Sequence, residues 1–126
     1  MNGAGILALA HAGFHNAPEA QLAGDFLLAH DFSRYNVCSK FHPKYVHDRY
    51  HYGLLMACQG MYQLGGKYWQ AFFPPVVEIL LAHQQPDGSW PAENHHYDAR
   101  YGNAYTTALV LLTLGAPNQL LPIYQR

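Results

Sequence analysis

The chain has 126 residues, of which 50% are hydrophobic and 12% are charged, so it holds enough apolar material for the core of one ordinary domain. Its formal net charge is −1 and no Lys/Arg cluster occurs, which excludes the basic surface that nucleic acids or an anionic membrane attract. The apolar start at residues 6–10 is too short to cross a bilayer and no basic residue precedes it. We therefore expect no membrane span, no signal peptide and a cytoplasmic location for the chain as given.

Turn-forming residues divide the first half of the chain into predicted helices. A first helix is predicted over residues 2–12 and a second over residues 18–30. Residues 31–43 contain polar and turn residues without a hydrophobic period, which predicts a long loop. A third helix is predicted over residues 46–64, where Gly65 and Gly66 end it.

In the second half, two prolines are the main boundary signal. Residues 67–73 are predicted to form a short helical turn, after which Pro74 and Pro75 open a fourth helix that runs to residue 83. Residues 91–102 are predicted to be a loop. A fifth helix is expected over residues 103–114, followed by an extended tail at residues 120–126.

The apolar helices repeat along the chain. Three apolar helical runs end at Gly13, Gly65 and Gly115, which are about 50 residues apart, and Leu-Leu-Ala-His occurs at residues 27–30 and again at 80–83. Such a period is typical of αα-hairpins that stack or form a ring. The first, third and fifth helices are apolar nearly all round and fit an inner layer, whereas the second and fourth carry charged residues and fit an outer one.

A corner follows the fourth helix, where residues 84–90 read Gln-Gln-Pro-Asp-Gly-Ser-Trp. Proline ends the helix, Gly88 supplies the positive φ of a tight turn, and Trp90 is expected to pack back onto the fourth and fifth helices. Gln84 or Gln85 is expected to bond backbone at the start of a neighbouring inner helix. These four residues resemble the QW motif of the squalene-hopene cyclase and protein prenyltransferase repeat families.

The resemblance extends to residues 50–69, 101–108 and 121–126, which look like the C-terminal part of the prenyltransferase and squalene-oxidase repeat proteins of planctomycete-type bacteria. It implies an all-α fold: an incomplete α/α toroid of αα-hairpins, with residues 1–126 forming a single repeat domain of a larger toroid. The first and fifth predicted helices are apolar all round yet lack the neighbours that a toroid would give them, so we expect the chain either to self-associate through the faces around Leu7 and Leu111 or to be a portion of a longer toroid.

The catalytic motifs of these enzymes are not found in this sequence. No DxDD segment occurs, and residues 101–108, which are similar to the segment that carries the zinc-binding His of prenyltransferases, have Asn103 and Thr107 among their polar residues instead. His47 and His51 have the i, i+4 spacing of metal ligands but lack a third ligand at a recognisable distance. We therefore predict no metal and no cofactor.

Aromatic and histidine residues precede two predicted inner helices and form the candidate ligand cavity, because in a toroid such helix starts converge on one mouth. These residues are Tyr50, His51, Tyr97, Asp98, Arg100 and Tyr101. The predicted function is binding of an apolar ligand, an isoprenoid or another lipid, or of a protein partner, without catalysis by this chain. Three alternatives stay open at this point: a half of a class II terpene cyclase whose acid lies in missing sequence, a sugar-acting α/α-toroid lyase or hydrolase, and simple packing of these side chains between helices.

Overall fold

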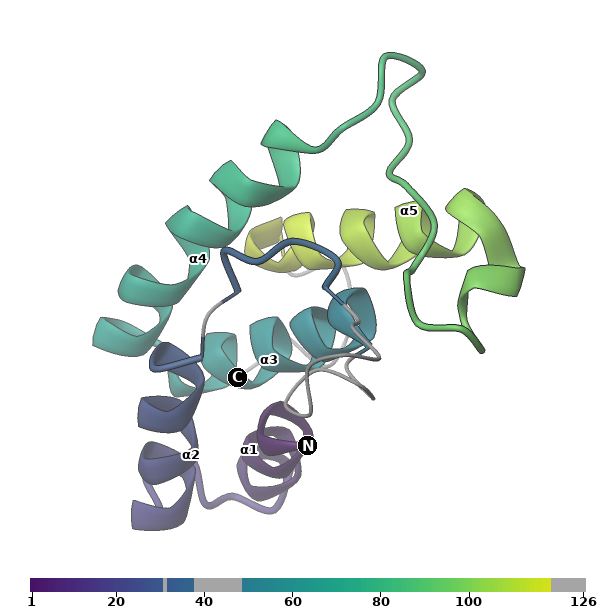
Figure 1. Ribbon diagram of the computed structural model, residues 1–126. Helices are drawn as coiled ribbons and strands as arrows, with labels where there is room; N and C mark the ends of the chain where they lie inside the picture. Colours follow the sequence, from purple (N-terminus) through teal and green to yellow (C-terminus); the bar gives the residue numbers. More distant parts are fainter. Residues whose placement is uncertain (31, 38–48, 119–126) are drawn as a thin grey trace.

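The computed structural model describes residues 1–30, 32–37 and 49–118, and all regular secondary structure within these ranges is helical (Figure 1). The all-α prediction is therefore confirmed for this part of the chain. The α-helices are α1 (Asn2–His11), α2 (Pro18–Leu28), α3 (Tyr50–Leu64), α4 (Gly66–Ala82) and α5 (Gly102–Leu114), and two short 3₁₀ helices are η1 (Ala99–Tyr101) and η2 (Ala116–Asn118). The predictions for residues 38–48 and for the tail from residue 119 lie outside the described residues.

Helix α3 lies at the centre of the arrangement. It runs between α1 and α5 in Figure 1 and contacts both of them, while α2 and α4 contact each other as well as α3. Eleven of the fifteen residues of α3 are buried, which explains why its sequence is apolar on nearly every face. Helices α1, α3 and α5 thus form one row beside α2 and α4, while the toroid itself stays a prediction.

Two glycines allow α1 and α3 to approach each other closely. A Cβ added at Gly3 would lie 2.3 Å from the carbonyl oxygen of Met56, and one added at Gly60 would lie 2.7 Å from the carbonyl oxygen of Gly3. Both neighbouring groups are backbone, so no side-chain rotation makes room. Gly60 meets both Gly3 and Ile6, so the first half of α1 packs directly on the middle of α3.

The prediction that Pro74 and Pro75 open the fourth helix is wrong. Helix α4 begins at Gly66, directly after α3, and continues through both prolines. Each proline removes the N–H that would bond the carbonyl four residues earlier, which frees the carbonyls of Gln70 and Ala71. All four residues are exposed, so this side of the helix faces water, which can satisfy the freed carbonyls.

The turn after α4 ends on a buried tryptophan. Trp90 is 1% exposed, and its indole N–H donates at 2.7 Å to the carbonyl of Leu80 in the last turn of α4, which also accepts from the backbone N–H of His83 at 3.1 Å. The backbone N–H of Trp90 donates to the hydroxyl of Thr107 on α5 at 3.1 Å. Trp90 therefore connects the end of α4 to the start of α5.

The glutamines of this turn bond the turn itself. The amide of Gln84 donates to the carbonyl of Gly88 at 2.9 Å, and the hydroxyl of Ser89 donates to the side-chain oxygen of Gln85 at 2.7 Å. Gly88 has the positive φ, 85°, that the sequence predicted. The prediction that Gln84 or Gln85 bonds a neighbouring inner helix is therefore not met by these bonds. Both side chains bond groups within residues 84–89, because the tight turn brings those groups closer to them than any helix.

Candidate functional site

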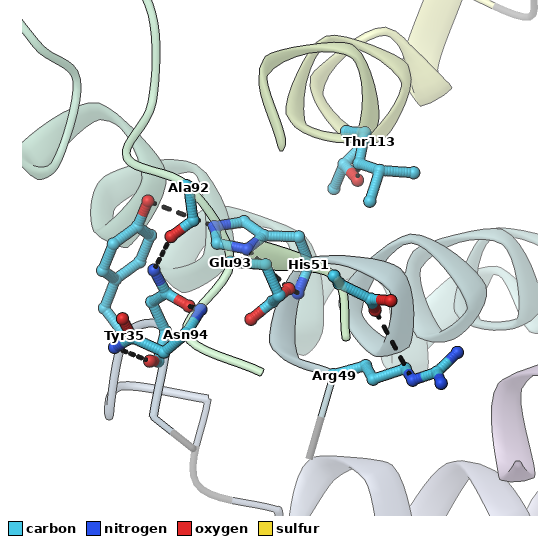
Figure 2. A network of polar contacts seen from close by, with 10 residues as sticks. Tyr35, Arg49, His51, Ala92, Glu93, Asn94 and Thr113 are labelled. Carbon is cyan, nitrogen blue, oxygen red and sulfur yellow. Dashed lines mark hydrogen bonds and ion pairs between the residues drawn. The ribbon is translucent and has the colours of Figure 1, made fainter. Parts of the chain in front are cut away.

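A buried carboxylate and imidazole join the start of α3 to the segment before α5. Oε2 of Glu93 lies 2.9 Å from Nδ1 of His51 and accepts a second hydrogen bond, also of 2.9 Å, from the backbone N–H of His51 (Figure 2). Both side chains are 1% exposed. A carboxylate removed from water to this degree requires such partners, so Glu93 ties its segment to the first turn of α3.

Tyr35 extends this cluster to the loop after α2. Its hydroxyl lies 3.1 Å from Nε2 of His51, and its ring stacks on that of His83 with the centroids 3.9 Å apart. Burial, and after it the negative charge of Glu93, raise the pKa of Tyr35 to about 12. The phenol therefore keeps its proton and can donate it to Nε2, while Nδ1–H of His51 donates to Glu93.

Two further contacts hold the same segments together. The side chain of Asn36 donates to the carbonyl of Ala92 at 2.8 Å and accepts from the backbone N–H of Asn94 at 2.9 Å. Arg49, directly before α3, lies 3.5 Å from the carboxylate of Asp98 through its Nε. Because Glu93 and His51 are closed to solvent and such contacts surround them, we interpret the Glu93–His51–Tyr35 cluster as a structural connection between loops rather than a reaction centre.

The structure brings together the two groups of residues that the sequence singled out, although not all of them face one another. Tyr50 and His51 are buried, with the hydroxyl of Tyr50 donating to the carbonyl of Phe32 at 2.8 Å. Asp98 is also buried, beside Arg49. The start of α3 and the segment before α5 therefore lie at the same end of the molecule.

The remaining three predicted residues are on the surface. Tyr97 is 56% exposed and Tyr101 is 53% exposed. Arg100 donates to the hydroxyl of Tyr101 at 3.0 Å and lies over its ring. None of the six predicted residues lines either of the two cavities described next, so a common ligand cavity formed by them stays a prediction.

The larger cavity is a groove of about 440 Å³, which we call the α1–α2–α3 groove. It lies where the first turns of α1 and α3 meet the end of α2. Its lining residues are Met1, Asn2, Gly3, Ala4, Phe26, Leu27, His30, Phe32, Arg49, Tyr52, Gly53 and Met56. Most of these side chains are apolar, and the volume is in the range of small-molecule sites, about 300–1,000 Å³.

A second cavity of about 220 Å³ lies between α2 and α4. It shares Leu27, His30 and Phe32 with the larger groove and is otherwise lined largely by apolar residues of α4, Phe72 and Val76 among them. The two hollows are therefore separated by the same few side chains at the end of α2.

No protein-family model, curated protein or solved structure matches this chain.

Metal binding finds no support in the described ranges. Within residues 1–30, 32–37 and 49–118, no three His, Cys, Asp or Glu side chains are grouped so that they could hold a metal ion. His47 lies outside these ranges, and its predicted partner His51 has both ring nitrogens engaged by Glu93 and Tyr35. In the same part of the chain, no helix has the length and hydrophobicity needed to cross a membrane.

Sequence reasoning missed three residues that organise this end of the molecule: Tyr35, Arg49 and Glu93. Glu93 is the single acidic residue between Trp90 and Tyr97, in a segment that also contains a histidine pair. A single acid next to a predicted apolar core indicates a buried carboxylate, and a buried carboxylate requires a hydrogen-bonding partner. Arg49 directly precedes Tyr50 and His51, which were predicted to face the ligand. The sequence therefore indicated where Arg49 lies, but not that it pairs with Asp98.

Proposed function

We propose that this chain is a non-catalytic helical repeat domain that binds an apolar ligand, an isoprenoid or another lipid, in the α1–α2–α3 groove. The observation that carries the proposal is the groove itself, a hollow of about 440 Å³ whose walls include Phe26, Leu27, Phe32 and Met56. Phe26 and Tyr52 are 60% and 45% exposed there, so large apolar and aromatic surface faces solvent unless a ligand covers it.

The wider arrangement supports this interpretation. Helices that begin at the groove, α1 and α3, belong to the row of helices that the sequence predicted to form an inner layer. The resemblance to terpene cyclase and prenyltransferase repeats suggests apolar ligands for such a layer. The two acids that the structure describes at this end of the molecule, Glu93 and Asp98, are buried at 1% and 6% exposure, which favours binding over catalysis.

Gly53 provides a direct test because it lines the groove and a Cβ added to it would meet nothing within 4 Å. Gly53→Phe places a ring in the groove, whereas Gly53→Ala adds one methyl group. Binding of the neutral dye Nile red and its displacement by dodecanol would be measured for both variants. We expect Gly53→Phe to weaken binding at least about tenfold, since a filled pocket loses the apolar contacts of the ligand, and Gly53→Ala to change it little.

The matched control is Gly5→Phe on α1, an exposed position that also has open space around it but does not line the groove. It adds the same ring to the surface and should leave binding unchanged. Equal binding by all variants, or no displaceable binding by the unmodified protein, would contradict the proposal.

Association with a protein is a second candidate function, favoured by the open side of α5. Ala104, Ala108 and Leu111 lie along this helix at exposed positions, and Leu111 is 57% exposed. Helix α3 is covered by α1 on one flank and by α5 on the other. Among the described residues, no helix covers the exposed side of α5 in the same way, so another helix could pack on that side.

A further inference from the structure

We propose that the ligand of the α1–α2–α3 groove is a single-chain amphiphile with a monoanionic carboxylate head, which Arg49 binds at the rim. This inference rests on the proposed function, because it assumes that the groove is a ligand site. It adds the chemistry of the polar end of the ligand, for which the apolar walls of the groove give no information.

The contact of Arg49 with Asp98 leaves other donors of its guanidinium available. It lines the groove and its side chain is 49% exposed. Its Nε faces Asp98 at 3.5 Å, and the dashed line of Figure 2 reaches the guanidinium there, while the two terminal nitrogens point away from that contact. A guanidinium has five N–H donors in a planar fork, so one edge can face Asp98 while the other binds a second carboxylate.

The charge of the described lining residues is complementary to one anionic group. Its described lining residues include Arg49 and His30 and no Asp or Glu, whereas the opposite wall is formed by Phe26, Leu27 and Met56. An apolar chain along that wall would leave its head at the guanidinium. A carboxylate paired with an arginine contributes more binding free energy than a neutral hydroxyl in the same place, because its hydrogen bonds are charge-assisted.

The Asp98 carboxylate limits how much negative charge the rim accepts. Asp98 is buried and already balances part of the charge of Arg49. A monoanion adds one further charge, while a phosphate dianion adds two beside the same carboxylate and is repelled more strongly. We therefore assign a carboxylate rather than a phosphate head.

The test compares three ligands with the same chain, dodecanoate, dodecanol and dodecyl phosphate, as competitors of Nile red. In the unmodified protein we expect dodecanoate to bind about tenfold more tightly than dodecanol, and this ratio to fall with added salt. Arg49→Gln should bring the ratio close to one without changing dodecanol binding. Asp98→Asn should move dodecanoate in the opposite direction, toward tighter binding, because it removes the competing carboxylate.

Arg100→Gln is the matched control, since Arg100 is exposed, stacks on Tyr101 and does not line the groove. It should leave the ratio unchanged, and the thermal unfolding of each variant confirms that it is folded. Equal affinities for dodecanoate and dodecanol would overturn the carboxylate assignment while leaving the groove intact, as would tighter binding of dodecyl phosphate. If Gly53→Phe instead binds Nile red and all three competitors as tightly as the unmodified protein does, the proposed function itself is contradicted.

Discussion

Replacing Gly3 with alanine tests how strictly the packing of α1 on α3 requires glycine. The new Cβ would lie 2.3 Å from the carbonyl oxygen and 2.4 Å from the carbonyl carbon of Met56, and 2.5 Å from the backbone nitrogen of Ala57. An unstrained carbon–oxygen contact is about 3.3–3.6 Å, so α1 must move away by about 1 Å. That movement separates Ile6 and Ala10, which are 1% and 5% exposed, from their neighbours.

The expected cost follows from these contacts. Forcing an extra methyl group into a closely packed contact costs about 1–3 kcal/mol, and alanine returns at most about 1 kcal/mol through its higher helix propensity. We expect Gly3→Ala to lower the free energy of unfolding by about 1–2 kcal/mol. The measurement is urea unfolding followed by far-UV circular dichroism.

Gly5→Ala is the internal control because it lies two residues further along the same helix. A Cβ at Gly5 meets nothing within 4 Å, so this variant should be as stable as the unmodified protein or up to about 1 kcal/mol more stable. The two substitutions therefore change stability in opposite directions. If Gly3→Ala proves as stable as Gly5→Ala, the close approach of α1 and α3 is not a feature of the folded protein.

Four further predictions concern single side chains. Trp90→Phe should lower the free energy of unfolding by about 1–3 kcal/mol, because it removes the indole N–H that satisfies the end of α4, and Trp90→Ala by about 3–5 kcal/mol; unchanged urea midpoints would refute the connection between α4 and α5. Burial raises the pKa of Cys58 to about 12, so in a Cys38→Ser background we expect no reaction with a thiol reagent near neutral pH until urea unfolds the chain, and rapid labelling would contradict this. Burial and Glu93 raise the pKa of Tyr35 from 10.0 to about 12, so its contribution to stability is present below pH 10 and is lost as the pH rises toward 12; Tyr35→Phe should remove one phenol from the late part of an alkaline absorbance titration and flatten this loss of stability, and an unaltered titration would count against it. Leu111→Glu should abolish any concentration-dependent association seen in sedimentation, whereas persistent association would exclude the open side of α5 as the contact.

The helices were predictable from the sequence because apolar runs and glycine stops are local signals. Gly65 ends α3, as the sequence indicated, and Leu114 ends α5 directly before Gly115. The prediction at Pro74 and Pro75 was wrong for a physical reason. Proline is excluded from a helix interior mainly where the carbonyls that it frees would have no other partner. On the exposed side of α4 that condition does not apply.

The site was less predictable because its parts come from distant segments. The groove brings together residues near positions 3, 27 and 53, and only the packing of three helices determines its volume. His51 could be singled out as a histidine at a helix start. Its bonds to Glu93 and Tyr35 depend on how two loops fold over that start, and no local pattern encodes this.

The bonds of Asn36 and His51 also affect how the chain unfolds. In an ideal repeat protein each hairpin contacts only the next, so the hairpins can melt one after another. Here Asn36 bonds Ala92 and Asn94, and His51 bonds Glu93, which joins segments separated by 42 to 58 residues. The loop after α2 and the start of α3 therefore cannot separate from the segment before α5 without breaking these polar bonds. The described part of the chain should then melt in one cooperative transition despite its repeated sequence.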